Sequence, residues 1–491
     1  IVALRLEEME FEARDVLFPV RIEVDNSTTD FTRLTVFSED TPFFLYALSN
    51  ALSLRGVSIE QLTIRTCQNE IQDELYIVDA RGRKITDTAR LDQIKFSILL
   101  TKEFTFFLPQ APEPYAAVSR FEQLVGDVVR LPEQGHWVEV LSSPRMLQDL
   151  AKLLGASDFM WEDFVRGQYE TLLPMLGPHM DTSEFDDTGG DDILHRLRET
   201  VASEASTELK KRRLNEFKDR EIFVIDLNHI LSPDVDFEIL AKRLTTLAEA
   251  VVTVAFELAY TEVTDRFGYP RTVAGLEANY AVFGLGKMGG AALGYASDIE
   301  LLTVYDDNGT TDGDDSIANA EFFNRFVQEA VSLVTAKRDG IFNIDLRLRP
   351  HGKSGPLATS LAGFCNYYGL CGPAHAYERL ALVRLRHIAG AQDLGERLER
   401  IRDDIIYFSK SIDIRELREL RERQFREKNQ PGRLNAKFSP GALVDLEYDV
   451  QLLQVMYASD SPALRTPRIR AALEGLRQAG VITAGETGQL I

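Results

Sequence analysis

The clearest pattern of apolar and polar positions lies near the middle of the chain. A short apolar run, Tyr280 to Phe283, is stopped by Gly284 and Gly286. A second run, Asp298 to Tyr305, opens with acidic residues and continues with aliphatic and β-branched ones. Glycine interrupts both strands and helices, and short runs of β-branched and aliphatic residues are typical of strands. The pattern therefore predicts a strand, a glycine turn, a short helix and a second strand.

Within the second predicted strand, side chains two positions apart share a face. Asp298 and Glu300 should therefore point the same way, while Ile299 and Leu301 point into the core. Two carboxylates on one face repel each other, and a divalent cation with a preference for oxygen ligands, such as Mg²⁺ or Mn²⁺, would neutralise them. The alternative is a half-buried strand at a sheet edge with a solvated charged face.

A third stretch, Phe342 to Pro350, also alternates. It places Asp345, Arg347 and Arg349 on one face and Ile344, Leu346 and Leu348 on the other. A carboxylate beside two guanidinium groups on an exposed strand face suits a polyphosphate and its metal ions. A solvated edge strand is again the alternative.

Residues 1–110 alternate strand and helix patterns. A strand is expected at Arg33 to Ser38, followed by a helix with Thr41 as a possible N-cap and an end at Arg55-Gly56. Two strands, Ser58 to Arg65 and Glu74 to Val78, and a second helix from near Thr86 should follow. A proline-rich linker then leads to a region of helical periodicity over residues 115–275, in which the acidic tract 181–192 is predicted to be a mobile loop.

Composition narrows the possible partners. The chain has 491 residues, enough for about three domains, with 44% hydrophobic and 27% charged residues. Its formal net charge of -22 repels phosphate backbones, so nucleic acid is not an expected partner. No apolar run approaches the roughly 20 residues that span a bilayer, and no signal-peptide pattern is present, so we expect no membrane association and a cytoplasmic location. The three cysteines are too few and scattered for a disulfide framework, and the chain begins with Ile1, as an excised portion of a longer protein would.

The glycine turn with an acidic pair and a third carboxylate on a later strand resembles the polymerase-β type of nucleotidyltransferase. A longer set of motifs resembles the glutamine synthetase adenylyltransferase family, which often has aspartate where this chain has Glu300. These motifs are Gly284-Leu-Gly-Lys-Met-Gly-Gly290, Ser297-Asp-Ile-Glu-Leu301, Asp345-Leu-Arg-Leu-Arg-Pro350, Ser354-Gly-Pro-Leu357, Tyr377-Glu-Arg-Leu-Ala-Leu-Val383 and Lys437-Phe-Ser-Pro-Gly-Ala-Leu-Val-Asp-Leu-Glu447.

This resemblance implies an α+β fold with a polymerase-β-like nucleotidyltransferase core flanked by helical domains. The core would span residues 276–390, after a helical domain at 115–275 and before a C-terminal helical domain at 391–491 that we expect to be truncated. Residues 1–110 resemble a βαββαβ ACT domain, especially those of the PII uridylyltransferase family, through Asp73-Glu-Leu-Tyr-Ile-Val-Asp79 and Gly82-Arg-Lys-Ile-Thr-Asp87. ACT domains often bind an amino acid at the turn before the first helix, where the bulky Phe43 would crowd a ligand.

The resulting hypothesis is Mg²⁺- or Mn²⁺-assisted nucleotidyl transfer. Asp298 would bridge two metal ions, Glu300 would hold the nucleotide metal, and Asp345 would bind the second metal and accept the proton of the attacking hydroxyl. The other proposed residues would contact phosphates through backbone N–H groups, side-chain donors or positive charge: Gly284, Gly286, Lys287, Gly289, Gly290, Ser297, Arg347, Arg349 and Lys353.

The family resemblance further implies that the acceptor is a tyrosine of glutamine synthetase. AMP is either added from ATP or removed by phosphate to give ADP, and the sequence leaves the direction open. One alternative is uridylyl transfer to a PII signal protein, suggested by the ACT resemblance; that family usually places its ACT pair after the core and carries a His-Asp hydrolase domain, which is missing here. Another alternative is a non-catalytic regulatory module that binds nucleotide and glutamine synthetase, although a decayed site would not need three mutually repelling acids.

Overall fold

The structure, a computed structural model, divides into two compact units. It describes residues 20–39, 41, 43–67, 70–128, 143–156, 158, 161–162, 190–232, 236–295, 297–336, 342–409, 412–428 and 434–490. The first unit comprises residues 1–187 and 226–234, and the second comprises 188–225 and 235–491. Most of the predicted acidic tract 181–192 lies outside the described residues, and its last three residues open a helix. Among the helices described, none is long and apolar enough to cross a membrane.

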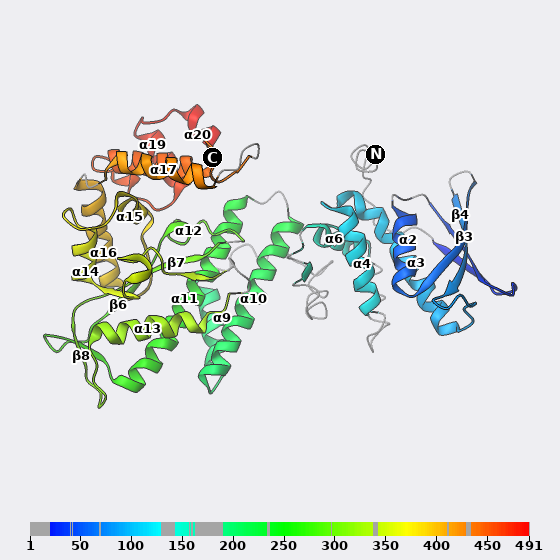
Figure 1. Ribbon diagram of the computed structural model, residues 1–491, viewed down its shortest axis with the longest axis horizontal. Helices are drawn as coiled ribbons and strands as arrows, with labels where there is room; N and C mark the ends of the chain where they lie inside the picture. The colour runs from blue at the N-terminus through cyan, green and yellow to red at the C-terminus, as the bar shows by residue number, and fades with distance from the viewer. Residues whose placement is uncertain are drawn as a thin grey trace. The chain divides into compact units, whose positions relative to one another are not determined.

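The first unit contains a four-stranded antiparallel sheet in the order β1-β2-β4-β3. Its strands are β1 (Arg21–Asp25), β2 (Thr32–Ser38), β3 (Val57–Cys67) and β4 (Glu70–Asp79). Side chains of β2 alternate between buried and half-buried, because one face packs on helices α2 (Phe44–Leu54) and α3 (Thr88–Phe107). Leu34 and Leu75 of the sheet share a buried cluster with Leu48 and Ile98 of these helices. Figure 1 shows α2 and α3 beside β3 and β4.

The expected βαββαβ order is wrong in one respect. It required a strand after the second helix, but the described part of the first unit continues there as η1 (Leu108–Gln110), α4 (Pro114–Val128) and α6 (Pro144–Ala156). The edge beside β2 is formed instead by β1, which precedes it in the chain. The sheet thus has four antiparallel strands, but the chain supplies them in the order ββαββ.

The start of helix α2 also differs from the prediction. Phe43, not Thr41, is the N-cap residue, and it has a left-handed φ of 62° with no side-chain cap. The Thr41 hydroxyl is hydrogen-bonded to that of Thr105 at 2.8 Å. The Phe43 ring packs edge-on against Tyr115, with 4.7 Å between centroids. The predicted end at Arg55-Gly56 is confirmed, since Arg55 is the C-cap and Gly56 has a φ of 63°.

The second unit is built around a mixed five-stranded sheet. Its main path is β10 (Ala358–Ser360), β7 (Ile299–Tyr305), β6 (Tyr280–Gly284) and β11 (Arg386–Gly390), and β9 (Ile344–Asp345) pairs with β7 in parallel. Helices α11 (Phe237–Phe267) and α13 (Asn319–Leu333) pack against the sheet. Aromatic rings of α13 contact both neighbours. The ring centroid of Phe326 lies 5.3 Å from that of Phe256 of α11, and the ring of Phe323 stacks on Tyr305 of β7 with 4.5 Å between centroids.

Helices before and after the sheet complete the second unit. In Figure 1, β6 and β7 lie between α11 and α13 on one side and α15, α17 and α19 on the other. Helices α9 (Gly190–Ala202) and α10 (Thr207–Leu231) precede the core, with residues 226–231 of α10 assigned to the first unit, and a small β5–β8 pair (Pro270–Thr272 with Gly309–Thr311) completes the strands. The later elements are η4 (Gly352–Ser354), α14 (Leu361–Tyr368), α15 (Ala376–Ala381), η5 (Leu382–Arg384), α16 (Gln392–Asp403), the π-helix η6 (Asp404–Phe408), α17 (Ile414–Lys428), α18 (Leu443–Tyr457), η7 (Pro462–Leu464), α19 (Ile469–Gln478) and α20 (Ala484–Leu490).

Candidate active site

The predicted strand, glycine turn, short helix and strand are confirmed. β6 ends at Gly284, the short helix α12 spans Gly286–Gly289, and β7 begins at Ile299. Gly286 has a φ of 50°, and a Cβ placed there would lie 1.4 Å from Oε2 of Glu300. Glycine is therefore required at this position both by the backbone conformation and by the carboxylate that lies over it.

The Glu300 carboxylate is held against this glycine turn. Its Oε2 accepts a hydrogen bond from the backbone N–H of Lys287 at 3.2 Å, and its main-chain carbonyl accepts one from Leu285 at 2.9 Å. Burial raises the pKa of Glu300, and the charges of Asp345 and Asp298 raise it further, against the opposing effects of the Lys287 N–H and Arg384.

Asp345 lies beside Glu300, because β9 pairs in parallel with β7 and these two residues are register partners. Arg347 donates to Asp345 from its backbone N–H at 2.8 Å and from its guanidinium at 2.5 to 2.9 Å. Burial opposes ionisation of Asp345, but the hydrogen bonds and charge of Arg347, aided by Lys353, hold the pKa of this carboxyl below its ordinary value. Asp345 is therefore a carboxylate whose ionised form is stabilised.

The predicted alternating strand over Phe342 to Pro350 is wrong beyond Asp345. The strand ends there, and the chain turns, because the Asp345 side chain accepts the Arg347 N–H that a strand would use for pairing. Arg349 consequently points into the turn, where its guanidinium donates to the carbonyl oxygens of Leu346, Lys353 and Gly355 at 2.8 to 3.2 Å. Arg349 is only 8% exposed, so its observed contacts hold the loop together.

The remaining predicted residues surround the turn in different ways. A Cβ on Gly289 would lie 1.8 Å from the carbonyl oxygen of Arg384, so this glycine allows close packing of α12 on η5. A Cβ on Gly284 would lie 2.9 Å from Cγ of Met288, and one on Gly290 would lie 2.9 Å from a guanidinium nitrogen of Arg384. The Ser297 hydroxyl accepts from the Gly294 N–H at 3.0 Å and from the Lys287 ammonium at 3.4 Å.

A cavity of about 390 Å³ opens beside the glycine turn. It has three sources of lining residues: the turn and β7, the segment α15–η5, and the C-terminal segment that contains α18. The turn and β7 with the residues before it contribute Gly286, Lys287, Ser297, Asp298 and Glu300. The segment α15–η5 contributes Tyr377, Leu380, Ala381 and Arg384, and the loop after β9 contributes Leu348. The C-terminal segment contributes Lys437, Leu443, Val444, Glu447, Tyr448 and Gln451. The described lining leaves out Gly284, Gly289, Gly290, Asp345, Arg347, Arg349 and Lys353.

Arg384 is a site residue that sequence reasoning missed. It is 4% exposed, and its guanidinium donates to the carbonyl oxygen of Gly286 at 3.4 Å and lies 3.3 Å from Oε1 of Glu447. It therefore ties helix α18 to the glycine turn. The motif that ends at Glu447 resembled the adenylyltransferase family in the sequence, and the structure places Glu447 on the cavity wall.

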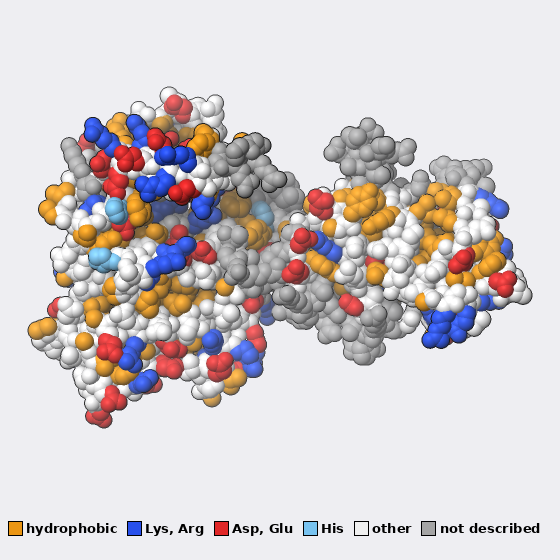
Figure 2. Space-filling model, viewed as in Figure 1, with side chains coloured by type: hydrophobic (Ala, Val, Ile, Leu, Met, Phe, Trp, Pro, Cys, Tyr) orange, Lys and Arg blue, Asp and Glu red, His pale blue; other side chains and the backbone are white. Residues whose placement is uncertain are grey.

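The cavity lining carries as many cationic as anionic side chains, although the chain as a whole is strongly acidic. Lys287, Arg384 and Lys437 face it, against the carboxylates of Asp298, Glu300 and Glu447. Figure 2 shows Lys and Arg side chains gathered on the visible face of the second unit, between α17 and the strands. This arrangement suits an anionic ligand whose own charge, together with a cation, balances both sets of groups.

The donor chemistry of Asp298, Glu300 and Asp345 fits a hard divalent cation, since all three offer carboxylate oxygens: Glu300 and Asp345 from the adjacent strands β7 and β9, and Asp298 from the residue before β7. Their present orientation is different. Glu300 is turned to the Lys287 N–H and Asp345 to Arg347, and no three acidic, histidine or cysteine residues in the described chain converge as a metal site. Metal binding would require these carboxylates to exchange those partners for the ion.

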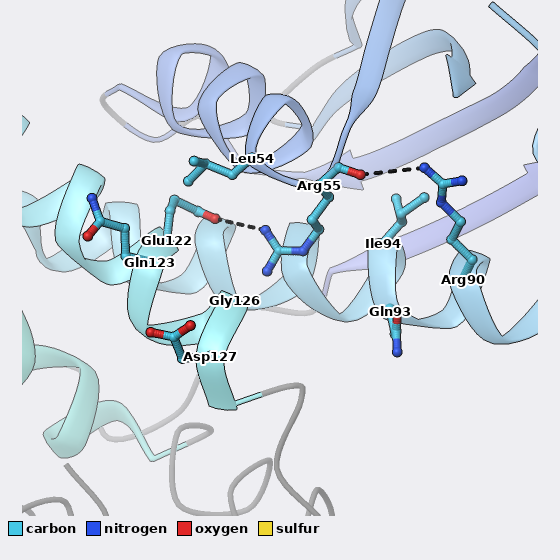
Figure 3. Close-up of a pocket in the computed structure, with 9 residues that line it drawn as sticks. All are labelled: Leu54, Arg55, Arg90, Gln93, Ile94, Glu122, Gln123, Gly126 and Asp127. Atoms are coloured by element: carbon cyan, nitrogen blue, oxygen red, sulfur yellow. Dashed lines mark hydrogen bonds and ion pairs between the residues drawn. The ribbon is translucent and has the colours of Figure 1, made fainter. Parts of the chain in front are cut away.

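A second cavity, of about 460 Å³, lies within the first unit between α2, α3 and α4. Figure 3 shows Arg55 reaching toward Glu122, and Arg90 toward the main chain at Arg55. Glu122 accepts a hydrogen bond from the Thr101 hydroxyl and lies 3.5 Å from the Arg55 guanidinium. Burial raises the pKa of Glu122 to about 7, an effect that Thr101 and Arg55 only partly offset. These polar groups are already hydrogen-bonded or ion-paired to one another, so the cavity walls form an internal polar network that joins three helices.

Comparison with known proteins gives a consistent picture. The model of the glutamate-ammonia ligase adenylyltransferase family matches residues 147–401, which includes β6, β7, β9 and the three acids. The chain is similar to bifunctional glutamine synthetase adenylyltransferase/adenylyl-removing enzymes. The protein of Acinetobacter baylyi is 30% identical over 404 residues, covering 78% of this chain and 42% of its own length. That of Hahella chejuensis is 29% identical over 389 residues, covering 75% and 39%.

The chain therefore spans about two fifths of the length of these curated relatives. The family match covers just over half of the 491 residues, and it includes the glycine turn and the carboxylates that form the candidate site. The N-terminal sheet precedes the matched region. On this match, the chain belongs to the glutamate-ammonia ligase adenylyltransferase family.

Proposed function

We propose that this chain is a nucleotidyltransferase that adds AMP to a tyrosine of glutamine synthetase from ATP, or removes it with phosphate to give ADP. One observation carries the proposal: the cavity beside the glycine turn combines Asp298 and Glu300, with Asp345 next to them, and the cationic side chains of Lys287 and Arg384. Membership of the adenylyltransferase family supports the reaction class, and the names of the similar proteins support glutamine synthetase as the partner.

In this proposal, different residues bind the phosphates, hold the metal ions and accept the proton. Lys287 and the backbone of the glycine turn bind the phosphates, with Ser297 positioning the Lys287 ammonium. Asp298, Glu300 and Asp345 would hold Mg²⁺ or Mn²⁺, which when bound offsets the negative charge that builds on the phosphates. Asp345, kept ionised by Arg347, is the proposed acceptor of the proton of an attacking hydroxyl.

The direction of transfer follows from which nucleophile enters the site. A tyrosine hydroxyl attacks the α-phosphorus of ATP, forms the new P–O bond to AMP, and releases pyrophosphate. In the reverse sense, phosphate attacks the same phosphorus in AMP-tyrosine, the bond to tyrosine breaks, and ADP leaves. Both reactions place the same phosphoryl group against the carboxylates, so one cavity can serve either.

The test is incubation of the chain with Mg²⁺ and ATP or UTP, separately with glutamine synthetase or a PII signal protein, followed by mass measurement of the acceptor. Adenylylated synthetase is incubated in parallel with phosphate. We expect either a gain of AMP on the synthetase or its phosphate-dependent loss. Transfer of UMP to the PII protein would redirect the proposal, and no change in any reaction would overturn it.

Variants then test the assignment of the acids. Asp298→Ala and Asp345→Asn should each lower the rate of transfer by at least about a hundredfold, because each removes an oxygen ligand and a charge at the reacting phosphate. Asp315→Asn is the matched control, since Asp315 is an exposed acid of the same unit outside the cavity lining. Unchanged transfer in Asp298→Ala would show that the carboxylates do not carry the chemistry.

A further inference from the structure

One face of helix α18 forms a wall of the candidate active site. Val444, Glu447, Tyr448 and Gln451 recur at intervals of three and four residues, and all four line the cavity. Glu447 is tied to the glycine turn through Arg384. Gln451 lies about one helical turn beyond Glu447, roughly 5.4 Å further along the axis. It therefore faces the cavity at a distance from the turn that binds phosphate in our proposal.

Gln451 is an exception among the buried amides of this helix. Its side chain is 7% exposed, yet its carboxamide makes no hydrogen bond to any residue that the structure describes. Gln454, three residues later and 2% exposed, donates instead to the carbonyl oxygens of Leu464 at 2.7 Å and Thr466 at 2.8 Å. The side-chain nitrogen and oxygen of Gln451 are not among the buried polar atoms that lack a partner, so they are accessible at the cavity wall. Its donor and acceptor are therefore open to a ligand in the cavity.

The surroundings of Gln451 suit a flat, aromatic ligand. Tyr448 precedes it by three residues on the same face, and Tyr377 of α15 lines the same cavity. Leu443 and Val444 add apolar surface beside them. Aromatic side chains bind nucleobases by stacking on the base plane, and a carboxamide binds them through their edge.

We propose that Gln451 determines the base specificity of this site, by pairing its carboxamide with the edge of adenine while Tyr377 and Tyr448 contact the base plane. This inference rests on the proposed nucleotidyl transfer and identifies how that site selects its nucleotide. The base is the end of a nucleotide farthest from its phosphates. With the phosphates on the glycine turn, it reaches the part of the cavity that Gln451 lines.

The pairing follows from the donor and acceptor pattern. A carboxamide presents one carbonyl acceptor and an N–H donor side by side. Adenine offers the complementary pair, an amino donor beside a ring-nitrogen acceptor. Guanine offers two adjacent acceptors on its corresponding edge, so one of its contacts with Gln451 would oppose acceptor to acceptor. Uracil can pair with an amide, but it offers a smaller plane to the two tyrosines.

The test is to measure the dissociation constants of ATP, GTP and UTP by calorimetry, in the whole chain and in Gln451→Met. Methionine keeps the length and volume of the side chain and removes its donor and acceptor. We expect the wild-type chain to prefer ATP, and Gln451→Met to weaken ATP at least about tenfold while GTP changes by less than about twofold. In the transfer reaction, KM for ATP should rise with kcat unchanged, because the base contact is the same in ground and transition states.

Two controls make the outcome specific. Gln478→Met removes the same amide from an exposed position on α19 outside the cavity lining and should leave all three constants unchanged. Gln451→Glu keeps the shape and converts the donor to an acceptor, so it should lose the preference for ATP as Gln451→Met does. Unfolding temperatures within the error of wild type would show that neither variant acts through the fold.

Each contrary result has a distinct meaning. If the wild-type chain binds ATP but Gln451→Met keeps the same ratio of ATP to GTP affinity, the assignment of Gln451 is wrong and the proposed transfer stands. If the wild-type chain binds UTP or GTP as tightly as ATP, adenine selection by this amide is likewise overturned. If it binds no nucleotide and transfers none, both this inference and the proposed function fail.

Discussion

The Glu122 carboxyl group of the first unit keeps its proton up to a higher pH than an ordinary glutamate does. Burial raises its pKa from 4.5 to about 7 in the folded chain. Between these values the folded state keeps a proton that the unfolded state has released, so the free energy of unfolding falls as pH rises from 4.5 to about 7. The difference of between two and three pH units corresponds to about 3 kcal/mol.

Glu122→Gln should remove this dependence on pH. The amide keeps one acceptor, which can face Arg55 while its NH2 group donates to the Thr101 hydroxyl, and it does not ionise, so the variant should be less sensitive to a change from pH 5 to pH 8 than the wild type. Thermal unfolding followed by circular dichroism at both pH values measures the effect. Glu60→Gln, an exposed glutamate of the same sheet, is the control and should keep the wild-type slope. An equal slope in Glu122→Gln would contradict the assignment.

Gly286 is required both by its left-handed backbone conformation and by the closeness of the Glu300 carboxylate, and two variants can separate these effects. Gly286→Ala places a Cβ in the left-handed region, which costs roughly 1–2 kcal/mol, and also drives it into the Glu300 carboxylate. We expect transfer to fall at least about a hundredfold, since the carboxylate and the turn must both move. Glu300→Asp withdraws the carboxylate, so Gly286→Ala combined with Glu300→Asp should be more active than Gly286→Ala alone. Equal loss in both would show that backbone strain is the whole effect.

The loop after β9 shows how an element can change the role of a residue type. Arg347 and Arg349 read as equivalent phosphate ligands on an alternating strand. In the structure, Arg347 is 61% exposed at its side chain and pairs with Asp345, while Arg349 is buried and donates to three carbonyl oxygens. Only the second of these arrangements fixes the loop.

Arg349→Ala should therefore act on stability. It removes the side-chain donor from three carbonyl oxygens in partly buried hydrogen bonds, and we expect a loss of about 2–4 kcal/mol in the free energy of unfolding of the second unit. Arg347→Ala should cost less than about 1 kcal/mol, because its ion pair is exposed. Denaturant titration measures both, and nucleotide binding is measured alongside. If Arg349→Ala weakened nucleotide binding without loss of stability, its predicted place on the phosphates would be restored.

The strands and helices were predictable from sequence wherever local signals agreed. The run Ile299 to Tyr305 and the glycine stop at Gly284 defined β6 and β7, and Arg55-Gly56 defined the end of α2. The Asp345 turn was not predictable, because a side chain took the backbone donor that the alternating pattern assigned to a strand. Arg384 and Gln451 were missed for another reason: their roles depend on which segment packs against α18, and no local pattern encodes that contact.

At the scale of the whole molecule, two units with separate cores imply two unfolding events. Residues 1–187 with 226–234 form one unit and the remainder forms the other. Ligand binding stabilises only the unit that contains the site. With ATP at about a hundred times its dissociation constant, the second unit should gain about 2.7 kcal/mol while the first is unchanged. Differential scanning calorimetry with and without ATP measures this, and a single transition that shifts as a whole would contradict it.

The charge of the whole chain also sets the role of the cavity. The chain as a whole carries a net charge of -22, whereas in the cavity the carboxylates of Asp298, Glu300 and Glu447 are offset by Lys287, Arg384 and Lys437. A nucleotide approaching the chain is repelled by most of its surface, so its association should depend on the local field of these three groups. The same acidity was the reason to expect a protein partner rather than a nucleic acid from the sequence.

The position of β1 in the N-terminal sheet affects how this sheet can fold while the chain is being synthesised. In the predicted order, the last strand would arrive only after the second helix had been synthesised. Because β1 supplies that edge, all four strands lie between Arg21 and Asp79, ahead of α3. Strand pairing therefore needs no residue beyond Asp79, and the emerging chain can close the edges of this sheet before the helix that covers it has left the exit tunnel.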